Sequence, residues 1–171
     1  FILVESLSVK IGGNNNNDAL RALLLQRSVA YSTLQNFDAA IADATTLLSI
    51  DSTSAMAYWH RAVCQIAMSG FKASNGVDVK LQEAGALSDL NKAIALKPQN
   101  AYLYYCRANL YAHQGNNEKA VADYTSAIKL DNRFAEAYFN RGLTYITLDN
   151  RSQGVKDLSK AGELGDRKSV V

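Results

Sequence analysis

Apolar residues from Asp18 onward recur at the spacing of amphipathic helices, in short segments that polar breaks separate into pairs. In the segment 101–134, an apolar stripe runs through the first half, Gly115 and Asn116 interrupt it, and a second stripe follows. Small residues occupy the points where two helices must cross closely, and tyrosines occupy those where the next pair must dock. The pattern predicts eight helices, near residues 18–35, 37–50, 54–69, 79–97, 101–114, 117–130, 135–148 and 151–163.

Four arginines and four aspartates keep one register along this pattern: Arg27, Arg61, Arg107 and Arg141, and Asp43, Asp89, Asp123 and Asp157. Successive arginines are separated by steps of 34, 46 and 34, and successive aspartates by steps of 46, 34 and 34. A single insertion between Arg61 and Asp89, equal in length to the difference of 12 between the two kinds of step, explains both long steps. A period of about 34 residues is typical of arrays built from helix pairs. We predict that the insertion forms a loop at Gly70–Val77, with Asp78 capping the next helix.

The third unit carries the motif Tyr104-x2-Arg107-Ala108-x2-Tyr111, followed by Ala120-x3-Tyr124 and Ala127. The fourth unit has the matching motif Tyr138-x2-Arg141-Gly142-x2-Tyr145. These motifs resemble those of the tetratricopeptide repeat family, and the resemblance covers about 150 residues of the chain. It implies an all-α fold, a right-handed α-solenoid of about four antiparallel helix pairs with the insertion in the second. The repeats would lie near residues 21–54, 55–100, 101–134 and 135–165.

Both ends of the chain depart from the repeat. Residues 1–17 are predicted to be a non-repeat tail and an Asn-rich linker, because Leu7, Val9 and Ile11 alternate with polar residues as in a strand. Asp18 is a candidate N-cap for the first helix of the array. The array would then span residues 18–165. Residues 166–171 are expected to begin a capping helix, which terminal repeats need.

The matching counts of arginines and aspartates favour an internal ladder of ion pairs over a row of ligand-binding cations. Asp43, Asp89 and Asp123 each lie 18 positions before the next arginine of the register, whereas the separation within a unit changes from 16 to 28 across the insertion. An inserted loop can leave the helix packing intact, so the spacing does not decide which arginine pairs with which aspartate. A buried pair adds little net stability but costs about 3–5 kcal/mol when one partner is removed.

The family resemblance implies that the first helix of each pair lines a concave surface on which ligands lie. The residues of these helices that avoid the core stripe form the predicted groove: Leu25, Val29, Met56, Trp59, His60, Val63, Tyr102, Tyr105, Asn109, His113, Glu136, Phe139 and Asn140. This lining is aromatic and almost uncharged, as expected of anchors for a peptide or a partner helix, and its asparagines can bond a ligand backbone. The alternative is that Trp59, Tyr105 and Phe139 only fill space between neighbouring first helices.

One binding mode of the family can be compared with these positions. Members that grip the C-terminal carboxylate of a chaperone use lysine, asparagine and arginine on successive inner helices. The matching positions here are Leu25, Val29, His60, Tyr102 and Cys106, or, one repeat further on, Trp59, Val63, Cys106, Glu136 and Asn140. Neither frame supplies a cation, so we do not expect a carboxylate clamp.

Composition narrows the function further. A net charge of +2 without a basic block argues against nucleic acid as a partner, and the longest apolar run is too short to cross a bilayer. Cys64 and Cys106 form no CxxC, and His60 and His113 have no partner at ligand spacing, so we expect no metal and no other cofactor. No catalytic motif is present, and we expect no enzyme activity. The cysteines leave the compartment open, with the cytoplasm favoured.

The leading hypothesis is therefore a non-catalytic module that binds a peptide or a partner surface in its groove. One alternative is a self-associating scaffold, a homo-oligomer that stacks through exposed repeat ends. The other is an accessory domain of a larger multidomain protein or enzyme. The sequence does not identify the partner.

Overall fold

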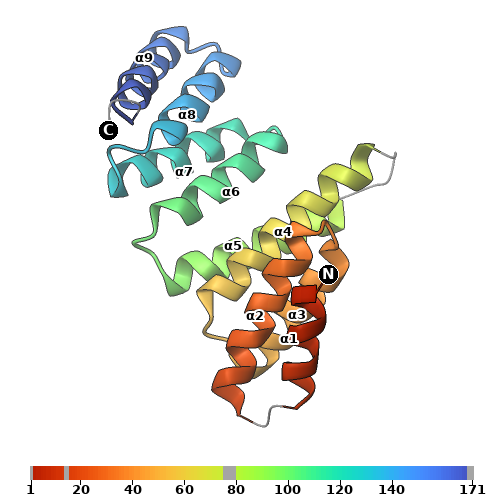
Figure 1. Ribbon diagram of the computed structural model, residues 1–171. Helices are drawn as coiled ribbons and strands as arrows, with labels where there is room; N and C mark the ends of the chain where they lie inside the picture. The colour runs from red at the N-terminus through yellow and green to blue at the C-terminus, as the bar shows by residue number, and fades with distance from the viewer. Residues whose placement is uncertain (1, 14–15, 75–79, 169–171) are drawn as a thin grey trace. The chain divides into compact units, whose positions relative to one another are not determined.

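The computed structural model describes residues 2–13, 16–74 and 80–168, and within these ranges every regular element is an α-helix (Figure 1). The elements are α1 (Ile2–Gly12), α2 (Asn17–Thr33), α3 (Phe37–Ile50), α4 (Ala55–Ser74), α5 (Lys80–Leu96), α6 (Ala101–His113), α7 (Asn117–Leu130), α8 (Ala135–Thr147) and α9 (Arg151–Lys168). They form two compact units, one ending at Leu96 and the other beginning at Lys97.

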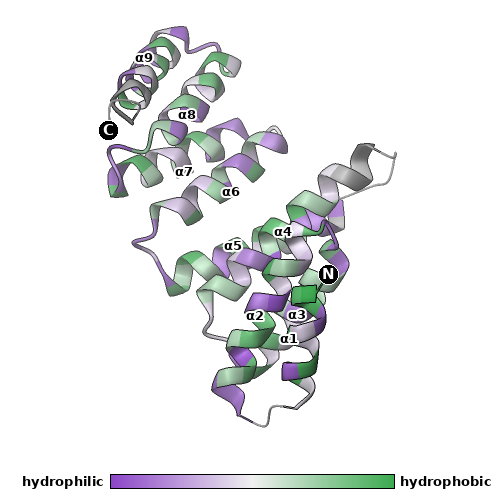
Figure 2. Cartoon of the chain, in the orientation of Figure 1, coloured by the Kyte–Doolittle hydropathy of each residue, from purple (hydrophilic) through white to green (hydrophobic). Residues whose placement is uncertain are grey.

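Each unit is a stack of helix pairs. In the first unit, α2 packs on α3 and α4 on α5, while α3 joins the two pairs through its contact with α4. In the second unit, α6 packs on α7 and α8 on α9, and α7 packs on α8. Apolar and polar residues alternate in bands along the helices, which is the pattern of amphipathic elements (Figure 2). The predicted all-α fold class of repeated helix pairs is confirmed.

The turns inside the pairs follow the repeat. Residues Gln35, Gly115 and Asp149 stand at equivalent places between the two helices of a pair, and all three have positive φ values, of 59°, 75° and 59°. Glycine adopts this left-handed backbone without strain, which explains its presence at one of the three sites. Asn36 follows the first of these turns and caps α3, because its side chain accepts a hydrogen bond from the Ala39 amide.

Small residues allow the two helices of a pair to approach closely. A Cβ atom on Gly154 of α9 would lie 2.8 Å from the carbonyl oxygen of Gly142 on α8 and 2.6 Å from a side-chain carbon of Ile146. The α4–α5 and α6–α7 pairs place alanines at such crossings, and Ala62, Ala86, Ala108 and Ala120 have no exposed surface. The helix spacing thus depends on side chains that are too small to separate the backbones.

The insertion lengthens α4 instead of forming a loop from Gly70. Helix α4 continues to Ser74, five residues beyond its predicted end, and α5 begins at Lys80. Residues 75–79, which include the predicted cap Asp78, lie outside the described residues.

The strand-like interpretation of the first residues was wrong, because Ile2–Gly12 forms helix α1, which packs on α2. The positions that alternate also fit a helical period: Leu7 is buried, Val4 and Ile11 lie beside it on the inner face, and Val9 is 78% exposed. A contact with α2 decides between the two periods. The predicted cap Asp18 was also wrong, since the side chain of Asn16 caps α2 by accepting from the Asp18 amide.

The last helix is longer than predicted. Helix α9 runs without a break to Lys168, so residues 166–168 continue it and do not begin a separate capping helix. Residues 169–171 lie outside the described residues. Within the described range, the outer face of the α8–α9 pair is therefore not covered by a further helix.

A candidate partner-binding surface in the second unit

The register of arginines and aspartates corresponds to a series of bidentate ion pairs. Each arginine donates from Nε and Nη2 to the two carboxylate oxygens of one aspartate, over 2.6 to 2.9 Å. The aspartate always comes from the second helix of the same pair, and Arg61 reaches Asp89 across the insertion. The sequence spacing did not decide which aspartate each arginine contacts. In the structure, each arginine contacts the aspartate of its own helix pair.

The third donor group of the guanidinium joins one pair to the pair before it. Arg61 Nη1 donates to Thr45 Oγ1 over 3.0 Å, and Arg141 Nη1 donates to Thr125 Oγ1 over the same distance. Arg27 Nη1 makes the equivalent bond to Ser8 Oγ of α1 over 3.1 Å. Helix α1 therefore takes the place of the second helix of a preceding pair. Its residues belong to the packed array and are not a tail.

The ion pairs also shape the electrostatics of the molecule. The hydrogen bond with Asp89 raises the pKa of the Arg61 guanidinium, and the Arg141 guanidinium lies over the ring of Tyr138 at 5.5 Å. The four arginines of the register form ion pairs with aspartates inside the fold. They therefore stabilise the helix packing and do not form a row of cations on a binding face.

The predicted groove residues differ in their exposure. In the first unit, Val29 and Met56 are exposed and Leu25, Trp59 and Val63 are half-buried. In the second unit, the exposed residues are Tyr102, His113, Glu136 and Phe139, and the half-buried ones are Tyr105, Asn109 and Asn140. His60 lies in the interior, where burial lowers the pKa of its imidazole against a hydrogen bond with the Ser28 backbone. It does not lie on an open surface.

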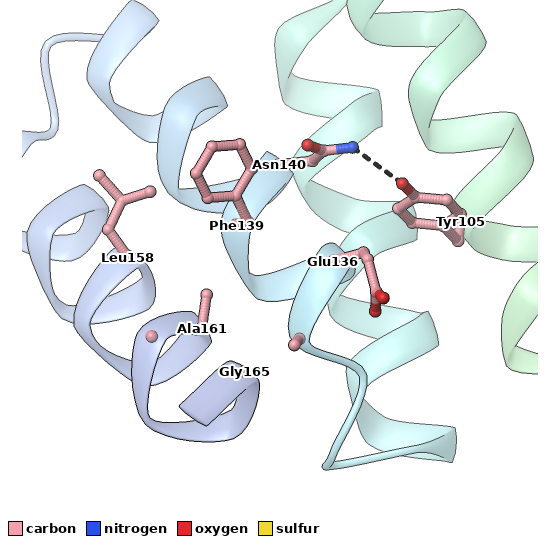
Figure 3. A pocket seen from close by; sticks show the side chains of 9 residues that line it. Tyr105, Glu136, Phe139, Asn140, Leu158, Ala161 and Gly165 are labelled. Carbon is pink, nitrogen blue, oxygen red and sulfur yellow. Dashed lines mark hydrogen bonds between the residues drawn. The ribbon is translucent and has the colours of Figure 1, made fainter. Parts of the chain in front are cut away.

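A chain of hydrogen bonds between α6, α7 and α8 holds the predicted groove residues of the second unit in fixed positions. The Tyr124 hydroxyl donates to Asn109 Oδ1 over 2.6 Å, and Asn140 Nδ2 donates to the same oxygen over 3.0 Å. Asn140 Nδ2 also donates to the Tyr105 hydroxyl over 3.2 Å (Figure 3). The ring of Tyr105 lies 4.8 Å from that of Phe134. The side chains of Asn109 and Tyr105 are thus held in place by protein groups, whereas the Asn140 oxygen points away from Tyr105.

A cavity of about 600 Å³ opens beside this network, between α8 and α9. Its lining is largely apolar: Tyr105, Ala135, Glu136, Phe139, Asn140, Leu158, Ala161, Gly162 and Gly165. Figure 3 shows Glu136, Phe139 and Asn140 along one side and the α9 residues along the other. Phe139 is 48% exposed, and Leu143 and Ile146 continue its exposed stripe along α8. The α9 residues escaped the sequence reasoning because it considered only first helices.

Other chemistry is sparse in the described part of the chain. No group of three histidine, cysteine, aspartate or glutamate side chains gathers there in a way that could hold a metal ion. Burial raises the pKa of the Cys64 thiol to about 11, so this buried cysteine stays protonated at neutral pH. None of the described helices is both long and apolar enough to cross a membrane.

Family models match most of the array. A model described as TPR repeat matches residues 108–149, and two described as Tetratricopeptide repeat match residues 90–122 and residues 22–54 and 135–164. The chain belongs to the tetratricopeptide repeat family. No curated protein matches the sequence.

Solved structures share this repeat fold. A crystal structure of MamA superimposes with a TM-score of 0.84 at 24% identity, over 98% of this chain and 90% of that one. The thermophilic tetratricopeptide repeat protein TTC0263 from Thermus thermophilus gives a TM-score of 0.72 at 19% identity, over 94% and 80%. The first such domain of Spaghetti (RPAP3), bound to the HSP90 peptide SRMEEVD, gives 0.66 at 21%, over 75% and 93%. At these identities the likeness concerns the fold.

Proposed function

We propose that this tetratricopeptide repeat protein is a non-catalytic interaction module that binds a polypeptide segment of a partner protein on α6, α8 and α9. The observation that carries the proposal is the exposed apolar stripe of Phe139, Leu143 and Ile146 beside a largely apolar cavity. Contiguous apolar surface next to a concave site is typical of interaction surfaces.

The polar groups at the edge of the cavity suit a peptide backbone. Asn140 donates to the Tyr105 oxygen, so the Tyr105 hydroxyl hydrogen can point to a ligand carbonyl. The Asn140 carbonyl oxygen is directed away from Tyr105 and can accept from a ligand amide. The surface therefore offers one donor, the Tyr105 hydroxyl, and one acceptor, the Asn140 oxygen, next to an apolar anchor site. The hydrogen bonds among Tyr105, Asn109 and Asn140 fix the positions of both groups.

The charge of the surface disfavours an acidic ligand. Among the described residues that line the cavity there is no lysine or arginine, and Glu136 supplies a carboxylate. The structural neighbour bound to the peptide SRMEEVD holds an acidic segment. We therefore expect this chain not to bind a chaperone C-terminus by a carboxylate clamp. Its affinity for an apolar segment should depend only weakly on salt, because few charges contribute.

A displayed library of random peptides, selected on the purified chain, tests the proposal. The affinity of the selected peptides is measured by calorimetry for the wild type, Phe139→Ala and Asn140→Ala. Removing the Phe139 anchor should weaken binding by about 2 kcal/mol, or roughly 30-fold. Asn140→Ala should weaken it by about 1 kcal/mol.

Val155→Ala is the matched control, because Val155 is exposed on α9 but does not line the cavity. It should leave the affinity unchanged. Selected peptides that bind Phe139→Ala and wild type equally well, or whose binding collapses at high salt, would place the interaction elsewhere and refute the proposal.

Self-association is the second candidate function, and one observation favours it. Helix α1 exposes the large apolar side chains of Ile2, Leu3 and Val9. These residues form a surface that a second copy of the chain can cover. Sedimentation velocity over a range of concentrations tests this: an oligomer that Val9→Ser abolishes supports self-association through α1, and a monomer at all concentrations excludes it.

A further inference from the structure

The cavity between α8 and α9 is the counterpart, one repeat later, of the surface on which α8 itself lies. Helix α8 covers a cluster in which Ala127 and Ile128 of α7 pack with Ala137, flanked by the α6 residues Ala101 and Tyr105. The four α6 and α7 residues of this surface are called its seat residues: Ala101, Tyr105, Ala127 and Ile128. One repeat further along the sequence, they correspond to the cavity residues Ala135, Phe139, Ala161 and Gly162. What fills the earlier site is helix α8 together with its N-cap residue, through the side chains of Phe134, Ala137 and Tyr138.

Two conditions make the cavity: no described helix covers it, and one position of this surface differs from its counterparts in the earlier repeats. Leu48, Ile94 and Ile128 occupy this position in the three earlier pairs, and all are buried. The fourth pair has Gly162, and apart from the glycine, its chain neighbours and the nearby backbone of α9, no atom lies within 4 Å of the place where its Cβ would stand. The same is true of Gly165, the counterpart of Asp131. A seat that elsewhere presents a large aliphatic ridge therefore presents a hollow here.

We propose that this cavity binds an amphipathic α-helix of a partner protein, with a large aliphatic side chain where α8 has Ala137. The inference rests on the proposed function, that this surface binds a polypeptide. It adds that the bound segment is helical and that its apolar residues follow the spacing i, i+3, i+4 of Phe134, Ala137 and Tyr138.

Complementarity of size gives the physical reason. Ala137 is fully buried and fits over Ile128, a small residue against a large one. With Gly162 in place of the isoleucine, an alanine would leave a void, and a leucine would fill it. The described part of the chain offers no further helix for this place, because α9 runs straight on to Lys168.

A size swap between probe and seat tests the inference. The probe is a synthetic peptide of residues 132–148, the chain's own α8 segment, held helical by a staple at the exposed positions 139 and 143. A second peptide carries Ala137→Leu. Both are titrated by fluorescence anisotropy into wild type and Gly162→Ile, with Gly162→Ala as a milder variant and circular dichroism as the check of folding.

On the wild type, the leucine peptide should bind on the order of tenfold more tightly than the alanine peptide, since most of three extra carbons become buried. On Gly162→Ile, the preference should reverse, and Gly162→Ala should give an intermediate ratio. Phe139→Ala should weaken both peptides, because the probe then loses one wall of its site.

Each other outcome counts against the inference. If both helices bind but the wild type prefers alanine, or Gly162→Ile leaves the preference unchanged, the seat is not a hollow for a large side chain. If library peptides bind in a Phe139-dependent manner and neither helix does, the surface binds polypeptides but not helices, and the proposed function survives alone. A dimer of the chain that Gly162→Ile abolishes would make a second copy the occupant and overturn the choice of a different partner.

Discussion

The pair of Arg107 and Asp123 gives the sharpest prediction about stability. Asp123 is buried, and its two oxygens accept from Arg107 Nε and Nη2 over 2.7 and 2.8 Å. Asp123→Ala removes both charge-assisted bonds and leaves the guanidinium, whose side chain is only 19% exposed, without its countercharge. Breaking a buried pair in this way costs about 3–5 kcal/mol. We expect about 3 kcal/mol, the lower end, because a part of Arg107 still meets water.

Replacing both members distinguishes the cost of an orphaned charge from the value of the pair. Arg107→Leu combined with Asp123→Ala leaves no buried charge, and leucine can still pack between the rings of Tyr104 and Tyr111, which now flank the guanidinium. The double variant should therefore be more stable than Asp123→Ala alone. Glu163→Ala removes an exposed pair with Lys160 and should change stability by less than about 0.5 kcal/mol.

Urea unfolding followed by circular dichroism measures these free energies. Repeat arrays can unfold in stages, so hydrogen exchange of peptides from α6 to α8 should accompany it and report the local loss. A cost below about 1 kcal/mol for Asp123→Ala, or a double variant whose cost equals the sum of the two single ones, would refute the reasoning.

Two further predictions concern packing and pH. Gly154→Ala should lower stability by about 1–2 kcal/mol, because the new Cβ meets the Gly142 carbonyl oxygen. Gly162→Ala has open space around the new Cβ and should raise stability by about 0.5–1 kcal/mol. Thermal melts that rank the two variants the other way would contradict this. Burial lowers the pKa of His60 below its ordinary value of 6.5. As the pH drops below about 6.5, the unfolded chain therefore binds a proton that the folded chain does not, and the free energy of unfolding should fall. In urea titrations between about pH 7.5 and 5.5, His60→Gln should lack this fall, and a fall that persists in the variant would assign it to other groups.

The sequence alone predicted the parts of this protein that recur. A periodic register of arginines and aspartates indicated helix pairs, and the interruption between Arg61 and Asp89 located the insertion. These features are readable because each repeat must make the same contacts as its neighbours, so the same residue types return at the same spacing. The apolar first helices likewise indicated Phe139 and Asn140 as surface residues of interest, and both line the cavity.

Tertiary structure decided whatever depends on a contact partner. Leu7 and Val9 fit a strand as well as a helix, and only packing against α2 buries one and exposes the other. Arg61 could have paired with either of two aspartates, and the packing of α4 on α5 brings Asp89 to it. The cavity at Gly162 is the clearest case. In the sequence, Gly162 is only a residue of low helix propensity. In the structure, it lines the cavity because no described helix covers it.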